Sequence, residues 1–258
     1  MSNTPTQHRP RTRTPTSASL PHPGQDGLRH DTAAAAEPTS TAPPTTPTRL
    51  EGPLRELPMF PLGTVLAPHM VLPLHVFEPR YRAMLDDVLA GDGEFGVVLI
   101  SRGHEVGGGD LRTDVGTIAR VVRAEQLDEE RWFVIAVGTE RMRVEGWLPD
   151  DPYPRAEVAA LDDEHDDDAD AVLSEVVPRL RRVLALQTEL GQADMPATFE
   201  VADDPSTACW QAVVLAPLTA FDAQRVLAID RCSERLQLLD ELLADLELTL
   251  RFQLDENG

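Results

Sequence analysis

Lysine is absent from this sequence, and all 23 of its basic Lys/Arg-type residues are arginine. The absence excludes Schiff-base catalysis, the phosphate-binding lysine of a P-loop and a Ser–Lys dyad, all of which need a lysine amine. Cysteine is scarce, and Cys209 and Cys232 are too few for a disulfide framework and lack metal-ligand spacing. We expect two reduced thiols packed as small apolar groups.

Long apolar runs are also missing. The sequence has no stretch of about 18 apolar residues, and residues 1–30 lack the apolar segment of a signal peptide, so a cytoplasmic protein is expected. Residues 1–50 hold 9 Pro and 11 Thr with almost no large apolar side chains. That composition predicts a disordered Thr/Pro-rich tail, because it cannot offset its ordering entropy by burial.

Positive charge is sparse in the rest of the chain. Residues 51–258 carry 18 Arg against 41 acidic residues, a net charge of −23. Nucleic acids and anionic membranes attract clustered positive charge, so neither is expected as a partner.

Short apolar runs separated by Gly and Pro predict a β-rich unit over residues 51–161. Strands are expected at 95–100, 116–123, 132–137 and 155–161. Two of them, 95–100 and 132–137, are continuously apolar, which predicts central strands buried on both faces.

Apolar and polar residues alternate between 141 and 147, as in a strand covered on one face. Met142 and Val144 are expected to face the core. Arg141, Arg143 and Glu145 are expected to face water.

One helix is predicted inside the β-rich unit, from Glu78-Pro79 to Gly91. Its apolar residues recur at spacings of three and four: Tyr81, Met84, Leu85 and Val88. The Gly-rich segment 101–114 is expected to be a hairpin loop.

Residues 162–170, DDEHDDDAD, predict a solvated acidic linker. His165 and its acidic neighbours could hold Ca²⁺ or Mg²⁺ loosely, but the spacing and the Gly of an EF-hand loop are missing. We therefore expect neither a metal nor a cofactor.

Residues 171–258 are predicted to form a helical subdomain. Helices are expected at 172–190 with a kink or restart at Pro178, at 205–216 capped by Asp204, at 222–229, and at 233–252 capped by Ser233. The last helix carries a leucine seam of Leu236, Leu239, Leu243, Leu246 and Leu250. Packing against the other helices is favoured over a coiled-coil dimer, which needs a longer repeat.

Several segments of the sequence, taken in order along the chain, resemble those of one known protein family. They are LPMFPLGTVLAPHMVLPLHVFEPRY at 57–81, VGTIARV at 115–121, the segment 138–164, DDPSTACWQAV at 203–213, APLTAFDAQRVL at 216–227 and ERLQLLDELL at 234–243. Together they resemble the N-terminal substrate-binding domain of Lon proteases. The resemblance implies an α+β fold, with a β-rich PUA-like pseudo-barrel followed by a helical bundle.

The resemblance also implies a function. Lon N-terminal domains recognise unfolded or degron-bearing proteins, whereas the ATPase and the Ser–Lys peptidase belong to other modules that are not expected here. We therefore expect a non-catalytic protein-binding module, an adaptor in protein quality control, as a monomer or weak dimer. A small hydrolase and, because of the PUA-like kinship, an RNA-binding protein are the alternatives.

Two short segments are the candidate peptide-binding site, and we expect them near one corner of the β-rich unit. They comprise Pro68, His69 and Met70, together with Phe77, Glu78, Arg80, Tyr81 and Arg82. An exposed apolar spot flanked by charges could hold a client segment. The alternative is that Phe77 and Tyr81 pack the helix on the sheet. Glu78 would then only place a negative charge at the positive N-terminus of the helix.

Other residues are weaker candidates. Ser101 and His104 could form a hydrolase pair, but no G-x-S-x-G elbow surrounds the serine, and a hairpin loop is favoured. We expect His75, Trp210 and Phe221 to be core residues.

Overall fold

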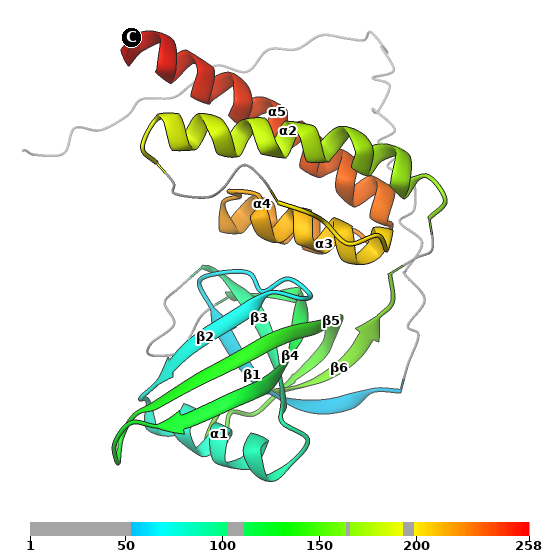
Figure 1. Ribbon diagram of the computed structural model, residues 1–258. Coiled ribbons are helices and arrows are strands. Elements are labelled where there is room, and N and C mark those ends of the chain that lie inside the picture. Colours follow the sequence, from blue (N-terminus) through cyan, green and yellow to red (C-terminus); the bar gives the residue numbers. More distant parts are fainter. Residues whose placement is uncertain (1–52, 103–110, 164–165, 193–198, 258) are drawn as a thin grey trace, which may run out of the picture. The chain divides into compact units, whose positions relative to one another are not determined.

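Six strands form a mixed sheet in the computed structural model, which describes residues 53–102, 111–163, 166–192 and 199–257 (Figure 1). The strands are β1 (Arg55–Leu62), β2 (Val71–Val76), β3 (Glu94–Arg102), β4 (Leu111–Gln126), β5 (Trp132–Leu148) and β6 (Arg155–Leu161). Their order is β2-β5-β4-β3-β1-β6, and β6 also pairs with β5. This pairing closes five strands into a barrel and leaves β2 as an extra strand on β5.

The length of β5 makes this closure possible. Its first half, Trp132–Val137, pairs with β2, and its second half, from Arg141 onward, pairs with β6. Register shifts in the ladders to β4 and β6 mark irregularities of the β-bulge kind, which let a long strand bend. The tail expected at 1–50 and the centre of the loop expected at 101–114 lie outside the described residues.

One face of the sheet and α1 (Pro79–Ala90) form one core, and a second cluster around Met59 and Met142 forms the barrel core. The buried residues of α1 are Tyr81, Met84, Leu85 and Val88, which confirms the predicted apolar face. Tyr81 stacks on Phe60 of β1 with ring centroids 4.2 Å apart. The helix is thereby fixed to the strand that opens the fold.

The predicted strands are confirmed, but burial on both faces holds for only one of the two central ones. Residues 94–99 of β3 are all buried. Val134 and Ala136 of β5 are buried, whereas the residues that alternate with them, Phe133, Ile135 and Val137, are half-exposed. These three point to the outer face, where no second layer covers them fully.

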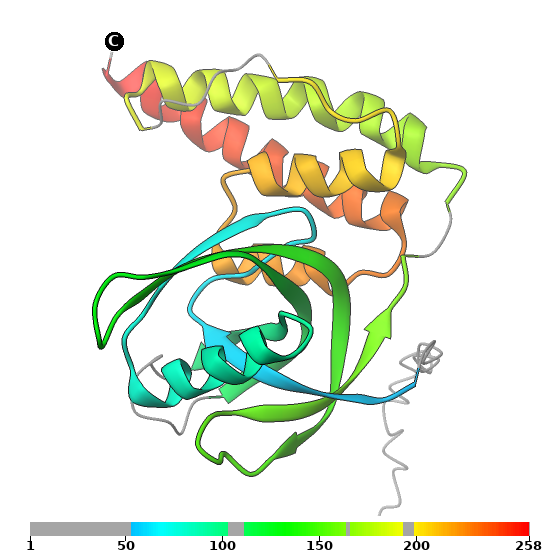
Figure 2. The ribbon, with the colours of Figure 1, turned by 60° about the horizontal axis from the view of Figure 1, so that its bottom comes forward.

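Four helices follow the sheet: α2 (Ala169–Glu189), α3 (Pro205–Leu215), α4 (Ala220–Leu227) and α5 (Cys232–Asn257), shown from a second angle in Figure 2. Helix α2 runs through Pro178 without a break. Asp204 caps α3 as predicted, since its carboxylate accepts the Thr207 backbone N–H at 2.9 Å. Among the described residues, no helix is both long and apolar enough to span a bilayer.

The leucine seam of α5 packs inside the helical part of the chain. Leu236, Leu239, Leu243 and Leu250 are buried in a core that includes residues of α2 and α3, and Leu246 is partly buried against it. Packing against the other helices is thus confirmed. Ser233 is not the N-cap of α5, because the helix begins at Cys232.

The acidic segment supplies that cap instead. The backbone N–H of Ser233 donates to Asp166 Oδ2 at 2.7 Å. This bond satisfies one of the free N–H groups of a helix N-terminus. The prediction that 162–170 is only a solvated linker is therefore wrong for Asp166.

The thiols of Cys209 and Cys232 are free and buried, as predicted. Cys209 lies on α3 and Cys232 opens α5, where its thiol donates to the Pro205 carbonyl at 3.8 Å. Both therefore pack between α3 and α5 in the helical core.

The loop between β1 and β2 is held against the barrel by backbone contacts. The N–H of His69 donates to the Gly138 carbonyl at 2.8 Å, and the N–H of Gly138 donates to the Met70 carbonyl at 3.0 Å. Thr117 Oγ1 donates to the Leu66 carbonyl at 2.6 Å. A Cβ on Gly138 would stand 2.3 Å from the Ala67 carbonyl oxygen, so only glycine permits this approach.

We expect Gly138→Ala to destabilise the fold by about 2 kcal/mol, because the added methyl group overlaps backbone that cannot rotate away. Urea unfolding followed by circular dichroism measures the change. Gly146→Ala, in the same strand, is the control, since its Cβ would meet only the flexible Glu157 carboxylate at 3.7 Å. Equal stabilities of the two variants would contradict the packing described.

Candidate functional site

The predicted peptide-binding residues lie at the two ends of β2 and not at one corner. Pro68, His69 and Met70 precede the strand, and the group from Phe77 to Arg82 follows it. Six extended residues separate the groups by roughly 20 Å. The strand β2 (Val71–Val76) therefore stands between the two groups.

At the end of β2 that leads into α1, most of the predicted residues already contact other residues of the protein. Tyr81 is buried in the core, and the Arg80 guanidinium lies 4.5 Å from its ring centroid. Arg80 Nε donates to the Glu78 carboxylate at 3.0 Å. Phe77 differs, because 58% of its surface is exposed.

Arg82, further along the same helix, is also engaged. Its Nη1 donates to the backbone carbonyl of Glu129 at 3.0 Å, which links α1 to the β4–β5 connection. Of the residues predicted at this end, Phe77 therefore presents the largest apolar surface.

An apolar surface joins the two ends along the outer face of β2 and β5. The residues of β2 alternate strictly between buried and exposed. Each exposed one lies opposite a half-buried apolar residue of β5, in the pairs Val71–Val137, Pro73–Ile135 and His75–Phe133. We call these six residues and Phe77 the outer strip.

His75 belongs to the outer strip and not to the core, which corrects its prediction. Its ring lies 5.1 Å from that of Phe133, centroid to centroid. The alternation of β2 decides this, because Leu74 and Val76 occupy the inward positions.

At the other end of β2, the turn residues line two cavities that share Trp210 of α3 as a wall. Met70 faces an apolar cavity of about 120 Å³. Pro68 and His69 face a polar cavity of about 210 Å³. His69 has a φ of 64°, in the left-handed region, as part of the turn that lets its neighbours face opposite ways.

A buried ion network lies beside these cavities. Asp163 Oδ1 accepts Arg141 Nε at 3.0 Å and Arg235 Nη2 at 2.8 Å. Its Oδ2 accepts Trp210 Nε1 at 2.8 Å and Ser206 Oγ at 3.2 Å. One carboxylate therefore connects β5, α3 and α5.

The two arginines of this network are enclosed. Arg141 is 1% exposed and Arg235 is 0% exposed, and the Arg235 guanidinium lies 3.8 Å from the Trp210 ring centroid. Arg141 Nη1 also donates to Asp230 Oδ1 at 2.9 Å and to the Ile229 carbonyl at 3.0 Å. These bonds satisfy charges that burial would otherwise make costly.

The prediction that Arg141 faces water is wrong, because Arg141 is 1% exposed. Sequence reasoning also missed Asp163 as a structural residue. The alternation of β5 correctly places Arg141 on the side away from Met142, which is in the barrel core. The helices cover that side, and this contact between distant segments leaves no periodic signal. Asp163 lies in the acidic run whose neighbours suggest only solvent exposure.

The environment of Asp163 keeps it ionised. Burial alone raises the pKa of its carboxyl, but Arg235, Arg141 and the Trp210 N–H outweigh burial and hold the pKa below its ordinary value. The carboxylate is thus a fixed negative charge between two fixed positive charges.

The described residues give little support to the hydrolase pair and the metal site that the sequence analysis considered. Ser101 Oγ donates to the Leu111 carbonyl at 3.0 Å, and its proposed partner His104 lies outside the described residues. Among the described residues, no group of three His, Cys, Asp or Glu side chains is placed to hold a metal ion. His165 lies outside them.

Comparison with known proteins decides the family. A model of the ATP-dependent protease La (LON) substrate-binding domain matches residues 56–245. The chain belongs to this family. Lon protease 2 of Myxococcus xanthus is 35% identical over 141 residues, covering 54% of this chain and 17% of the relative. Lon protease 2 of Herpetosiphon aurantiacus is 28% identical over 194 residues, covering 73% of this chain and 24% of the relative.

Solved structures agree with the Lon assignment. A Lon N-terminal domain protein from Xanthomonas campestris superposes with a TM-score of 0.52 at 25% identity, covering 74% of this chain and 98% of that one. The N-terminal domain of a Mycobacterium avium complex Lon protease gives 0.55 at 19% identity, covering 74% and 99%. The expected α+β fold, a pseudo-barrel followed by helices, is therefore confirmed. The chain spans a quarter or less of the full-length relatives described above.

We expect Asp163→Asn to destabilise the Lon domain by about 3 kcal/mol, because it leaves two buried guanidinium groups without their shared counter-charge. Thermal and urea unfolding measure the loss. Asp162→Asn is the matched control, since the Asp162 side chain is exposed. A change below about 1 kcal/mol at Asp163, typical of surface pairs, would contradict the role of this network.

We expect stability to fall as the pH drops below about 4. The pKa of Asp163 is lower in the folded than in the unfolded chain, so its contribution is complete above the unfolded value and is lost as the pH falls through the folded value. Urea unfolding between about pH 5 and about pH 2 measures the slope. Asp163→Asn should flatten the dependence of unfolding free energy on pH. Equal slopes for the wild type and the variant would show that Asp163 is not the cause.

Proposed function

We propose that this protein binds exposed apolar segments of unfolded or degron-bearing proteins and acts as a non-catalytic adaptor in protein quality control. Membership of the Lon substrate-binding domain family over residues 56–245 is the observation that carries the proposal. The outer strip is the surface to which we assign binding.

The geometry of the outer strip suits this task. Six of its seven residues stand on two hydrogen-bonded strands, and Phe77 directly follows β2, so the side chains of the six are held in place before a client arrives. Val71 and Phe77 are 57% and 58% exposed, at opposite ends. Burial of a large apolar side chain contributes about 1.5–3 kcal/mol, so several such contacts suffice for reversible binding.

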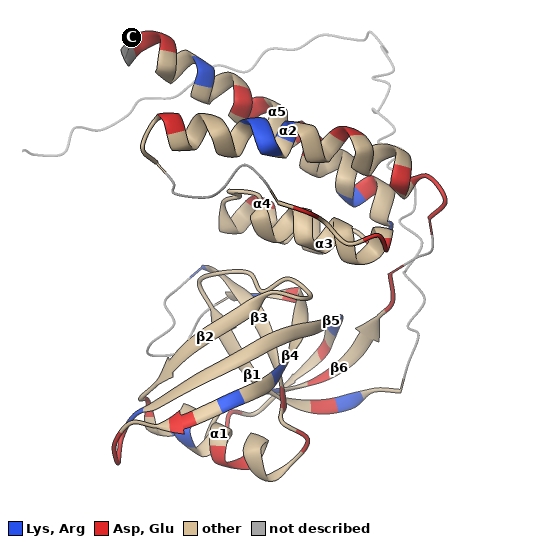
Figure 3. Cartoon of the chain, viewed as in Figure 1, with Lys and Arg blue, Asp and Glu red and all other residues tan. Residues whose placement is uncertain are grey.

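Charge supports protein clients over nucleic acid. The net charge of −23 on residues 51–258 repels phosphate backbones. Acidic residues gather on the connection from β6 to α2 and recur along the helices (Figure 3). This surface favours solubility and clients that are apolar or basic.

We expect Phe77→Ser to weaken binding of an unfolded reporter about tenfold, since it removes a large apolar side chain that is 58% exposed from the outer strip. Fluorescence anisotropy with a labelled, reduced and carboxymethylated protein measures the affinity. Phe252→Ser is the matched control, because Phe252 of α5 is 64% exposed and is not part of the outer strip. Equal losses in the two variants, or no binding by the wild type, would refute the proposal.

A further inference from the structure

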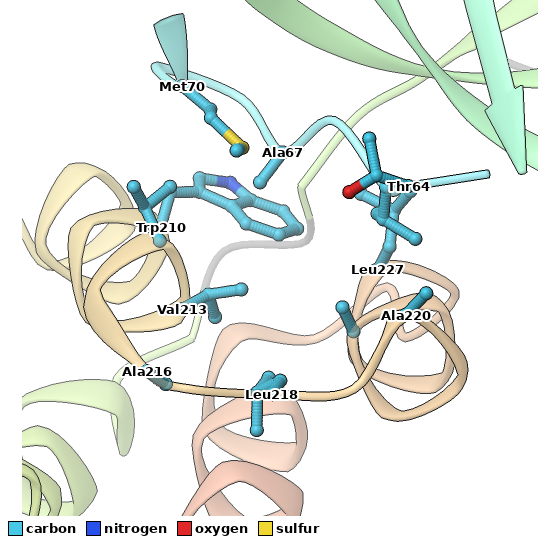
Figure 4. Close-up of a pocket in the computed structure, with 12 residues that line it drawn as sticks. Thr64, Ala67, Met70, Trp210, Val213, Ala216, Leu218, Ala220 and Leu227 are labelled. Carbon is cyan, nitrogen blue, oxygen red and sulfur yellow. The ribbon is translucent and has the colours of Figure 1, made fainter. Parts of the chain in front are cut away.

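The apolar cavity beside Trp210 is shaped to take a single side chain. Its walls come from the β1–β2 loop, α3 and α4, and the labelled side chains surround one central space (Figure 4). Its volume is about 120 Å³. An apolar protein cavity of about 150 Å³ holds a benzene ring, so this one fits a branched aliphatic side chain.

The walls of the cavity are held apart before any ligand binds. On the loop side, the Met70 N–H donates to the Ala67 carbonyl at 3.1 Å. On the helix side, Thr219 caps α4 by accepting the Asp222 N–H at 3.1 Å. Preformed walls lower the ordering cost of binding.

Exposed apolar residues continue from the cavity onto the surface. Val214 lines the cavity and is 39% exposed. Phe221, predicted to be a core residue, is 71% exposed and directly follows Ala220 in the cavity wall. The prediction for Phe221 is wrong because α4 turns Ala220, Ala223 and Leu227 inward.

The second cavity, across Trp210, is acidic. Arg141 and Asp163 in its wall neutralise each other. Glu140 and Asp162 also line it, and neither makes an ion pair with any residue that the structure describes. This cavity therefore has two carboxylates that form no ion pair with the described residues, and it favours a cationic group.

The two cavities are close enough for one segment to occupy both. They share the Trp210 side chain, and consecutive turn residues face them, Ala67 on the apolar side and Pro68 on the acidic side. Alternate side chains of an extended peptide are roughly 7 Å apart.

We propose that the cavities flanking Trp210 form a two-part site for a client segment in which a branched aliphatic residue lies beside Lys or Arg. The aliphatic side chain fills the apolar cavity, and the cationic group reaches Glu140 and Asp162. Charge complementarity selects this occupant over an apolar segment with acidic neighbours. This inference rests on the proposed function and specifies the class of segment bound.

The test uses the full chain and four labelled peptides that differ only in a central pair of residues: Leu-Arg, Leu-Gln, Leu-Glu and Ser-Arg, each in a Gly-Ser background. Fluorescence anisotropy should show Leu-Arg bound at least tenfold tighter than each of the others. The preference should shrink at high salt, because the acidic cavity is open to solvent. Equal affinities for Leu-Arg and Leu-Glu would overturn the proposal.

Variants in each cavity test which residues bind the cationic group and which bind the aliphatic side chain. Glu140→Gln with Asp162→Asn should bring the Leu-Arg to Leu-Gln ratio to about one. The control, Glu145→Gln with Glu241→Gln, makes the same charge change at exposed positions elsewhere and should keep the ratio. Ala223→Leu fills the apolar cavity and should bring Leu-Arg down to the affinity of Ser-Arg.

The outcomes separate this inference from the function on which it rests. A reporter that still binds, with no difference among the four peptides, rejects the two-part site and leaves the adaptor proposal standing. Failure of both the reporter and the peptides to bind rejects both. If Ala223→Leu lowers the melting temperature, the charge variants alone decide, because their side chains are exposed.

Discussion

The carboxylate of Asp163 is the contact on which the arrangement of the barrel and the helices depends. It accepts hydrogen bonds from Arg141 of β5, Arg235 of α5 and Trp210 of α3. Each partner is buried, so none of these groups has water as an alternative ligand. A network of this kind specifies one geometry, since any displacement leaves charges unsatisfied. Apolar packing between the same elements would tolerate small shifts.

That geometry also positions the two cavities that flank Trp210. Trp210 donates to Asp163 and forms the wall between the apolar and acidic cavities. Arg141 is in the wall of the acidic cavity, yet its charge is matched by Asp163 and Asp230. The remaining carboxylates, on Glu140 and Asp162, therefore determine the sign of the potential there. Arg141 and Asp163 thus hold the fold, Glu140 and Asp162 would select a client, and Trp210 contributes to both.

The outer strip and the cavities use different parts of β2. The strip follows the exposed face of the strand to Phe77, whereas the cavities lie beside the turn that precedes Val71. A client longer than about six extended residues could reach from one to the other. Two modest sites on one rigid scaffold would raise the effective local concentration of a bound chain, as in other multivalent binding.

The sequence by itself determined the elements and the family. The spacing of Tyr81, Met84, Leu85 and Val88 in α1, the Asp204 cap of α3 and the leucines of α5 are local signals, because periodicity and capping depend on neighbouring residues. Only the tertiary structure decided that Arg141 and Asp163 are buried partners, that His75 and Phe221 are exposed, and that the two predicted groups lie at opposite ends of β2. These facts depend on which surfaces meet. Contacts between residues as far apart as Arg141 and Asp230 leave no pattern in the residues around either one.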